Sequence, residues 1–133
     1  GEGPDSLNML PALTGAPREP IRDHLVISPA QKTHLSIRKG KWMYIPAQEG
    51  GGFTQTEIGQ HGFGGAATFK LTKQINSDVE NTKIKENAPS AQLYDLTLDP
   101  SQKKNLFDQY PEVIAELQVL LEKTMNQYSA QRE

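Results

Sequence analysis

The stretch Thr33-His-Leu-Ser-Ile-Arg-Lys-Gly-Lys-Trp-Met-Tyr-Ile45 decides the fold of this 133-residue chain. Its first half alternates polar and apolar residues, with Leu35 and Ile37 on one face, which is typical of a half-buried strand. A tight turn follows at Lys39-Gly40, because glycine supplies the positive φ that a two-residue hairpin connection prefers. The second half separates into two faces again, made of Trp42 with Tyr44 and of Met43 with Ile45. Residues 33–46 are therefore predicted to form a β-hairpin.

Two more strands and a long helix are predicted around this hairpin. Residues 23–28 and 91–96 are short runs with strand-like composition. Pro111 suits a first helical position, where its missing N–H costs nothing. An apolar stripe follows at helical spacing, with polar residues opposite. The stripe contains Ile114, Leu117, Leu121, Thr124, Met125 and Tyr128, and the opposite face contains Glu116, Gln118 and Glu122. The expected fold is α+β, an antiparallel sheet of about four strands packed against a helix over 111–129.

Shorter elements are expected on either side of this core. Residues 6–15 favour a short helical turn, which Pro11 interrupts and which Gly15 can close in the left-handed conformation. Residues 99–102 read as a helix start, with an aspartate as cap and a proline at the first position. Asn105 is a plausible stop for that helix, since asparagine tolerates left-handed geometry.

The segment 48–90 is rich in glycine and polar residues and is predicted to be a long loop. Its glycines do not form a dinucleotide-binding fingerprint, because their spacing is wrong and no strand and helix flank them. Two interpretations stay open for this segment. It is either a flexible surface loop or a loop that shapes a binding site, with His61 in its centre.

Composition excludes several classes of function. The length corresponds to one domain, 1–133, and the 14 basic and 16 acidic residues give a net charge of -2, without the basic excess of a nucleic-acid binder. No apolar run approaches the roughly 18 residues needed to cross a bilayer. With no cysteine, disulfides and thiolate zinc sites are excluded. No phosphate loop, G-x-S-x-G or H-E-x-x-H is present, so we predict no catalytic residue and no metal site. The start at Gly1, without an initiator Met, suggests a piece of a longer protein.

Several strings in this chain, taken in order, resemble the type I sulfatases of the arylsulfatase family. No single string is specific, but their order and spacing extend over nearly the whole chain. They are Asp5-Ser-Leu-Asn-Met-Leu-Pro-Ala-Leu13, Pro20-Ile-Arg-Asp-His-Leu-Val26, Ile37-Arg-Lys-Gly-Lys-Trp42, Gly50-Gly-Gly-Phe53, and Gln92-Leu-Tyr-Asp-Leu96 followed by Asp99-Pro100 and Asn105-Leu106. The resemblance implies the C-terminal subdomain of the alkaline-phosphatase-like sulfatase fold.

The resemblance also implies a parent enzyme that hydrolyses aryl or carbohydrate sulfate esters with calcium and a formylglycine residue. The formylglycine arises from the first residue of a Cys/Ser-x-Pro-Ser-Arg string, which is absent here. Calcium ligands in the family lie in the large N-terminal domain, and none can be assigned to this chain. The chain alone is therefore expected to be inactive. It would complete the fold and wall the substrate cleft beside the N-terminal catalytic domain, in a periplasmic or extracellular protein.

The sequence departs from the family pattern in two places. Gln102 stands where the family often carries an acidic residue, and the stretch 54–90 looks longer than in many relatives. Loop geometry therefore cannot be carried over from the family. Two other functions stay open: a stand-alone module that binds sulfated polysaccharide through the loop and the basic hairpin tip, or the C-terminal piece of a related phosphonate or phosphodiester hydrolase.

Three residues are candidate contacts to a sulfated substrate: His61, Arg38 and His24. An imidazole can donate to a sulfate group, and the arginine lies in a basic hairpin tip with two lysines. Each has a structural alternative, namely an exposed loop histidine, a solvated surface charge and a local hydrogen bond. Trp42 and Tyr44 likewise either stack on a sugar ring or pack within the sheet.

Overall fold

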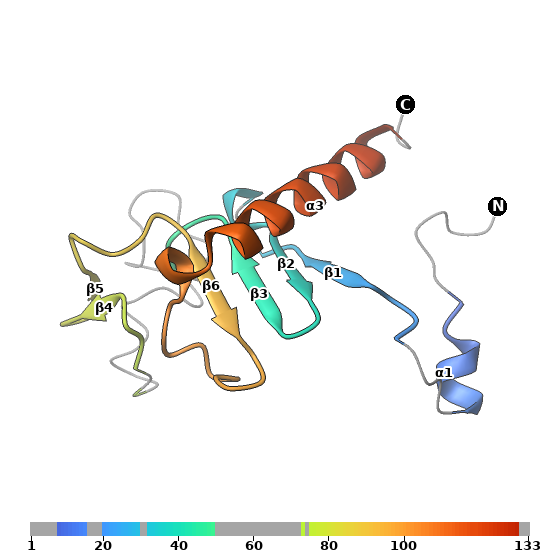
Figure 1. Cartoon of the computed structure of the whole chain (residues 1–133), viewed down its shortest axis with the longest axis horizontal. Coiled ribbons are helices and arrows are strands. Elements are labelled where there is room, and N and C mark those ends of the chain that lie inside the picture. Colours follow the sequence, from blue (N-terminus) through green and yellow to red (C-terminus); the bar gives the residue numbers. More distant parts are fainter. Residues whose placement is uncertain (1–7, 16–19, 30–31, 50–72, 74, 131–133) are drawn as a thin grey trace.

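The computed structural model describes residues 8–15, 20–29, 32–49, 73 and 75–130, with side chains up to position 127. Four strands form an antiparallel sheet in the order β1-β2-β3-β6, and the long helix α3 crosses one face of it (Figure 1). The strands are β1 (His24–Ile27), β2 (Ser36–Lys39), β3 (Trp42–Ile45) and β6 (Gln92–Asp95), and the helix is α3 (Pro111–Ala130). This architecture confirms the predicted α+β fold.

The hairpin of β2 and β3 is the centre of the sheet. Ile37 pairs with Tyr44 and Lys39 pairs with Trp42, so the two apolar faces predicted from the alternation are preserved. Gly40 adopts φ 55° in the two-residue turn, the left-handed region that glycine enters most easily. The first strand of the hairpin begins later than expected, because Lys32–His34 form a 3-10 turn before it.

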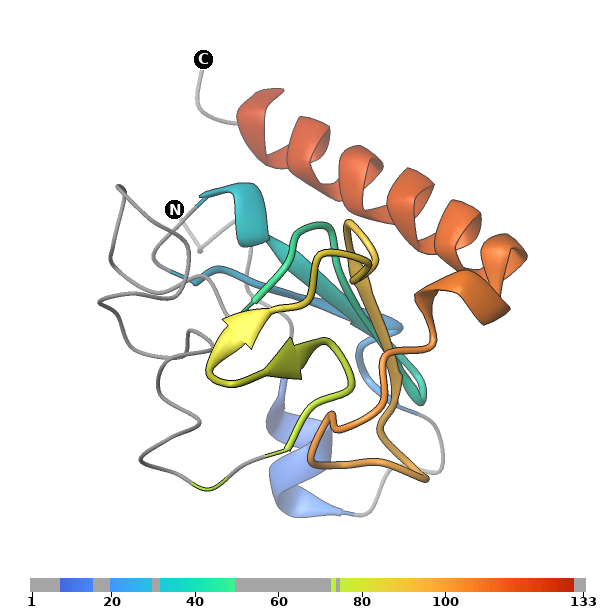
Figure 2. The ribbon, with the colours of Figure 1, turned by 90° about the vertical axis from the view of Figure 1, so that its left-hand side faces the viewer.

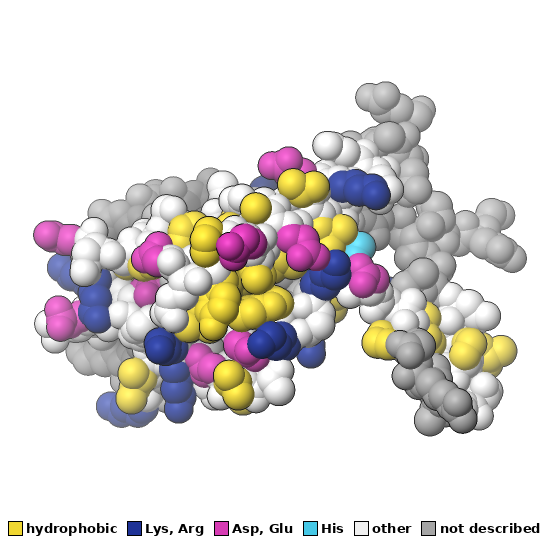
Figure 3. Space-filling view, in the orientation of Figure 1, with side chains coloured by type: hydrophobic (Ala, Val, Ile, Leu, Met, Phe, Trp, Pro, Cys, Tyr) yellow, Lys and Arg dark blue, Asp and Glu magenta, His cyan; other side chains and the backbone are white. Residues whose placement is uncertain are grey.

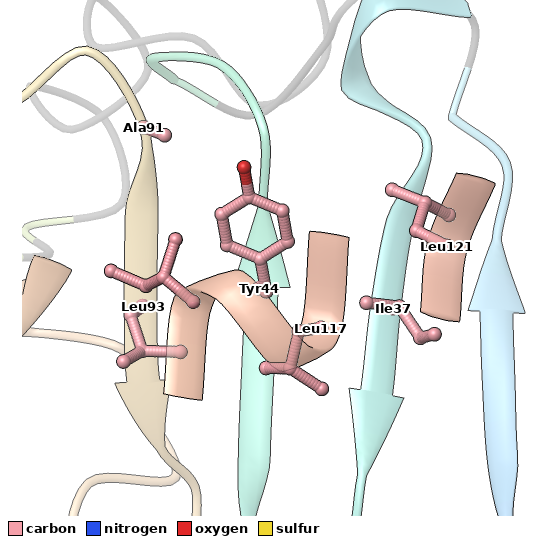
Figure 4. Close-up of a cluster of buried hydrophobic side chains, with 7 residues drawn as sticks. Ile37, Tyr44, Ala91, Leu93, Leu117 and Leu121 are labelled. Atoms are coloured by element: carbon pink, nitrogen blue, oxygen red, sulfur yellow. The ribbon is translucent and has the colours of Figure 1, made fainter. Parts of the chain in front are cut away.

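The main core lies between the sheet and α3. Ile37, Tyr44 and Leu93 point from three neighbouring strands toward α3, from which Leu117 and Leu121 meet them (Figure 4). Burial of such side chains contributes roughly 1.5–3 kcal/mol each. The stripe predicted for this helix is therefore correct in its central part. Met125 is exposed, because the C-terminal end of α3 extends past the sheet (Figure 1).

The opposite face of the sheet carries a smaller apolar cluster of Met43, Ile45 and Tyr94. The segment 75–90 approaches this face, since Asn76 Nδ2 donates to Tyr94 Oη at 2.9 Å. Within the stretch predicted as a long loop, β4 (Val79–Glu80) and β5 (Lys83–Ile84) form a short hairpin, seen in front of the sheet in Figure 2. Residues 50–72 of that stretch, including His61, lie outside the described residues.

The predicted helix over 99–105 is wrong. The chain there forms turns, and the next helical element is the 3-10 helix η3 (Phe107–Gln109). Asp99 does act as a cap, but its Oδ2 accepts from the backbone N–H groups of Lys103 and Lys104, at 2.6 and 2.8 Å. Gln102 adopts φ 54°, so the left-handed residue is not Asn105 and the chain turns back instead of winding on.

The first helix, α1 (Leu10–Thr14), is shorter than predicted. Asn8 Oδ1 accepts from the Leu10 N–H at 3.0 Å, and Pro11 lies in the first turn, where it is tolerated. Gly15 has φ −160°, so the predicted left-handed end is also wrong. Among the described residues no helix is long and apolar enough to cross a bilayer.

Candidate functional site

A hollow of about 980 Å³ opens at the end of the sheet where the central hairpin turns. Its walls come from residues 20–25, from the hairpin turn at 38–42 and from the first turns of α3. This volume lies within the roughly 300–1,000 Å³ usual for ligand sites. We call it the hairpin-end hollow. Two of the three predicted substrate contacts, His24 and Arg38, line it together, whereas His61 lies outside the described residues.

Strand register explains this convergence. β1 pairs antiparallel with β2, so that His24 lies opposite Lys39 and Leu25 opposite Arg38. The start of β1 and the end of β2 therefore meet at one edge of the sheet. Figure 3 shows basic, acidic and histidine side chains gathered between α3 and β1 on the face it displays.

Both lysine side chains at the hollow form ion pairs with carboxylates. Lys39 Nζ lies 2.8 Å from Glu116 Oε1 in α3, and this hydrogen-bonded carboxylate raises the pKa of Lys39. Lys41 Nζ lies 2.8 Å from Asp95 Oδ2 at the end of β6. The Lys41 ammonium, followed by the backbone N–H groups of Thr97 and Leu98, lowers the pKa of the Asp95 carboxyl against the opposing effect of burial. Both lysines therefore tie the hairpin turn to neighbouring elements.

The two arginines at the hollow are different. Arg22 and Arg38 are exposed and form no ion pair with any described residue. Arg38 Nε makes one long hydrogen bond, 3.4 Å to the Gly40 carbonyl oxygen. A guanidinium without a carboxylate partner keeps its planar set of donors available for an oxyanion. Sequence reasoning did not propose Arg22 as a contact, because nothing local in its string brings it to the hairpin turn.

His24 has a structural hydrogen-bonding role, but its main partner is distant in the sequence and not local as predicted. Its Nε2 lies 3.0 Å from Thr124 Oγ1, and that hydroxyl donates in turn to the Leu120 carbonyl at 2.8 Å. The imidazole Nε2–H is therefore the donor. The other ring nitrogen, Nδ1, lies 3.4 Å from Asp23 Oδ2. The bond to Thr124 orients the ring at the wall of the hollow, and a contact to substrate stays a prediction.

The structure shows packing for Tyr44 and a half-buried position for Trp42, the two aromatic residues of β3. Tyr44 is 1% exposed in the main core. The ring centroids of Trp42 and Tyr110 lie 5.0 Å apart, and the two ring planes are tilted by 52°. Lys41 Nζ lies 4.6 Å from the centroid of the Trp42 ring. Side chains of the chain itself therefore pack around part of the indole, whose remaining surface lines the hairpin-end hollow.

The described residues contain no group of three or more histidine, cysteine, aspartate or glutamate side chains that could hold a metal ion. The most connected polar side chain is Asn105, which sequence reasoning treated only as a helix stop. Its Oδ1 accepts from the N–H groups of Leu93 and Phe107, and its Nδ2 donates to Asp78 Oδ2 and the Ala91 carbonyl. These bonds make it a structural residue. The resemblance strings that contain Asp95, Asp99 and Asn105 thus encode the turn after β6.

Comparison with known proteins shows which proteins this chain is similar to. No protein-family model matches the chain. The chain is 32% identical over 122 residues to an N-acetylgalactosamine-6-O-sulfatase of Bacteroides thetaiotaomicron. This match covers 90% of the present chain and 18% of that protein. A sulfatase structure from work on the metabolism of multiple glycosaminoglycans by the same organism is similar with a TM-score of 0.54 and 32% identity. The match covers 91% of this chain and 20% of that one.

These matches confirm the predicted resemblance: the chain is similar to a part of sulfatases, and it shares an α+β fold with the solved sulfatase structure. The chain spans about a fifth of the length of the relatives it matches. Such a share is consistent with the predicted C-terminal subdomain of a larger enzyme.

Proposed function

We propose that this chain is the C-terminal part of a sulfatase that hydrolyses sulfate esters of a carbohydrate. The observation that carries the proposal is the 32% identity to an N-acetylgalactosamine-6-O-sulfatase over 90% of the chain. The name of that relative favours a sulfated sugar over an aryl sulfate as the natural substrate class. The hairpin-end hollow suits an anionic ligand, because its two arginines have no ion pair with any residue that the structure describes.

In this proposal the chemistry lies in an N-terminal catalytic domain of the same protein. The chain has no cysteine and no Cys/Ser-x-Pro-Ser-Arg string, and its described residues offer no metal cluster. In the parent we expect formylglycine to supply the nucleophile and calcium to act as a Lewis acid. The present subdomain completes the fold and forms one wall of the substrate cleft. By resemblance, we propose that the parent acts in the periplasm or outside the cell.

The proposal is tested with the full-length parent, produced together with a formylglycine-generating enzyme. We expect sulfate release from N-acetylgalactosamine 6-sulfate and loss of that activity in chelator. The isolated 133-residue chain should release none. A chromogenic phosphonate monoester and a phosphodiester serve as competing substrates. Faster turnover of either one by the parent would favour the related hydrolase over a sulfatase, and sulfate release by the isolated chain would contradict the division of labour.

His61 stays a predicted substrate contact in the parent. A contact to the non-reacting part of the substrate acts mainly on binding. His61→Ala should therefore raise KM for the sulfated sugar with little change in kcat, while a small aryl sulfate that cannot reach the loop should be unaffected. An unchanged KM for the sugar would make His61 an ordinary surface residue.

A further inference from the structure

We infer that the hairpin-end hollow is a binding site for a sulfated carbohydrate, held by Arg22 and Arg38. This inference rests on the proposed function and deepens it, because it names the residues of this chain that hold the anionic carbohydrate. Three properties of the hollow support this inference: its charge, its walls and its size.

Charge is the first property. Four cationic side chains line the hollow, from Arg22, Arg38, Lys39 and Lys41, against the carboxylates of Asp23 and Glu116. Glu116 is engaged with Lys39 at 2.8 Å, and Lys41 is engaged with Asp95 outside the lining. Asp23 lies beside His24 at 3.4 Å, but this histidine carries a charge only when it is protonated, so the Asp23 carboxylate still counts against the cations. The two arginines, which have no ion pair with a described residue, exceed this carboxylate by one charge and leave the hollow positive.

The chemistry of arginine indicates which anion fits. A guanidinium presents a planar fork of N–H donors, which matches two oxygens of one oxyanion. A sulfate ester carries three such oxygens and a single charge. Two arginines on different walls, one before β1 and one at the end of β2, can contact either one sulfate group or two groups along a glycan.

The walls and the size exclude a site for a bare ion alone. Ile21, Leu25 and Val113 contribute apolar surface between the charged groups. Ligand sites are usually lined by apolar side chains with a few placed polar groups, and apolar surface suits the C–H faces of a sugar ring. About 980 Å³ is far more than one sulfate ion occupies. The combination indicates a carbohydrate that carries sulfate rather than free sulfate.

The test measures binding of a defined probe to the 133-residue chain by isothermal titration calorimetry. The probe is a chondroitin tetrasaccharide with 6-sulfated N-acetylgalactosamine, and the unsulfated tetrasaccharide is its control. We expect the sulfated probe to bind, the unsulfated one to bind at least tenfold more weakly, and affinity to fall as salt rises. Inorganic sulfate should not compete at equal concentration.

Three variants assign the binding to the two arginines. Arg22→Gln and Arg38→Gln should each weaken binding of the sulfated probe about tenfold, as loss of a charge-assisted hydrogen bond does. Arg38→Lys keeps the positive charge but not the forked guanidinium, so its affinity for the sulfated probe should lie between those of Arg38→Gln and the unmodified chain. Lys83→Gln removes one exposed charge from β5, at the other end of the molecule, and should leave binding unchanged (Figure 1). The Tm of every variant should match that of the unmodified 133-residue chain, since both arginines are exposed.

The inference is overturned if the chain does not bind the sulfated probe, or if Arg22→Gln, Arg38→Gln and Lys83→Gln bind it equally. It is also overturned if the unsulfated probe binds as well. A different result would contradict the proposed function, namely that the full-length parent does not release sulfate from any sulfate ester. The two failures are therefore distinguishable, because one concerns binding to this chain and the other turnover by the parent.

Discussion

His24 at the start of β1 and Thr124 near the end of α3 are joined by a hydrogen bond of 3.0 Å across 100 residues of chain. β1 is an edge strand, paired only with β2 among the described strands. The bond therefore adds a second attachment, from the outermost strand directly to the helix. Because this imidazole also borders the hairpin-end hollow, any ligand there would touch a group that holds sheet and helix together.

Leu117 and Leu121 should be the stability-determining residues of α3. They are 1% and 5% exposed against the sheet, so truncation to alanine should leave a cavity that costs about 2–5 kcal/mol. In a chain of this size that corresponds to a fall in Tm of about 10 °C, measured by circular dichroism. Val119→Ala is the control, since that side chain is 66% exposed in the same helix. Similar losses at all three positions would mean that the helix face has been misassigned.

Gln118 should contribute to stability although it lies on the polar face of α3. Its Nε2 donates to Tyr44 Oη at 2.9 Å, and burial is the main cause that raises the pKa of this phenol. Gln118→Ala would leave a buried hydroxyl without a partner, which costs about 1–3 kcal/mol. In a Tyr44→Phe background the same change should cost almost nothing. Urea unfolding of the four proteins of this double-mutant cycle gives the coupling, and a coupling near zero would rule the bond out as a stabilising contact.

Asn105 should be the most sensitive polar position in the described chain. Asn105→Ala removes four hydrogen bonds of its side chain, to Asp78, Ala91, Leu93 and Phe107. We expect a loss of about 3 kcal/mol or more in the free energy of unfolding, because buried backbone groups lose their partners. Asn126→Ala, on the exposed side of α3, should change stability by less than about 0.5 kcal/mol. A small loss at Asn105 would show that water replaces its bonds.

Asp95 should make the fold sensitive to acid. Its pKa is lowered below the ordinary 3.8, first by the hydrogen bond from Lys41. A carboxyl with a lowered folded pKa stabilises the fold above its unfolded pKa, and this contribution is lost as the pH falls through the folded value. Asp95→Asn should therefore lower Tm at pH 6 and show a smaller further fall between pH 4 and pH 2.

The matched control for this prediction is Asp108→Asn, which neutralises an exposed carboxylate in η3. Its Tm profile should follow that of the unmodified chain from pH 6 to pH 2. If Asp95→Asn follows the same profile as well, the ion pair with Lys41 contributes nothing to stability.

Local sequence was sufficient for the central hairpin and for α3. The hairpin depends on alternation over a few residues and on a glycine at φ 55°, both of which are readable without knowing the rest of the fold. The start of α3 depends on Pro111, and its buried face depends on a stripe at helical spacing. The sulfatase resemblance also came from the order of short strings, and the comparisons confirm it.

Tertiary structure alone decided the turn after β6 and the candidate site. Residues 99–105 have the composition of a helix start, but the Asn105 side chain bonds to backbone groups of Ala91 and Leu93, which only the folded chain brings near. In the same way, Arg22 and Arg38 are 16 positions apart, and only the register of β1 on β2 places them at one hollow. Contacts between residues far apart in the sequence produce no periodic pattern that could be read from it. The alternation of each strand is the same whichever residues of the neighbouring strand lie opposite it.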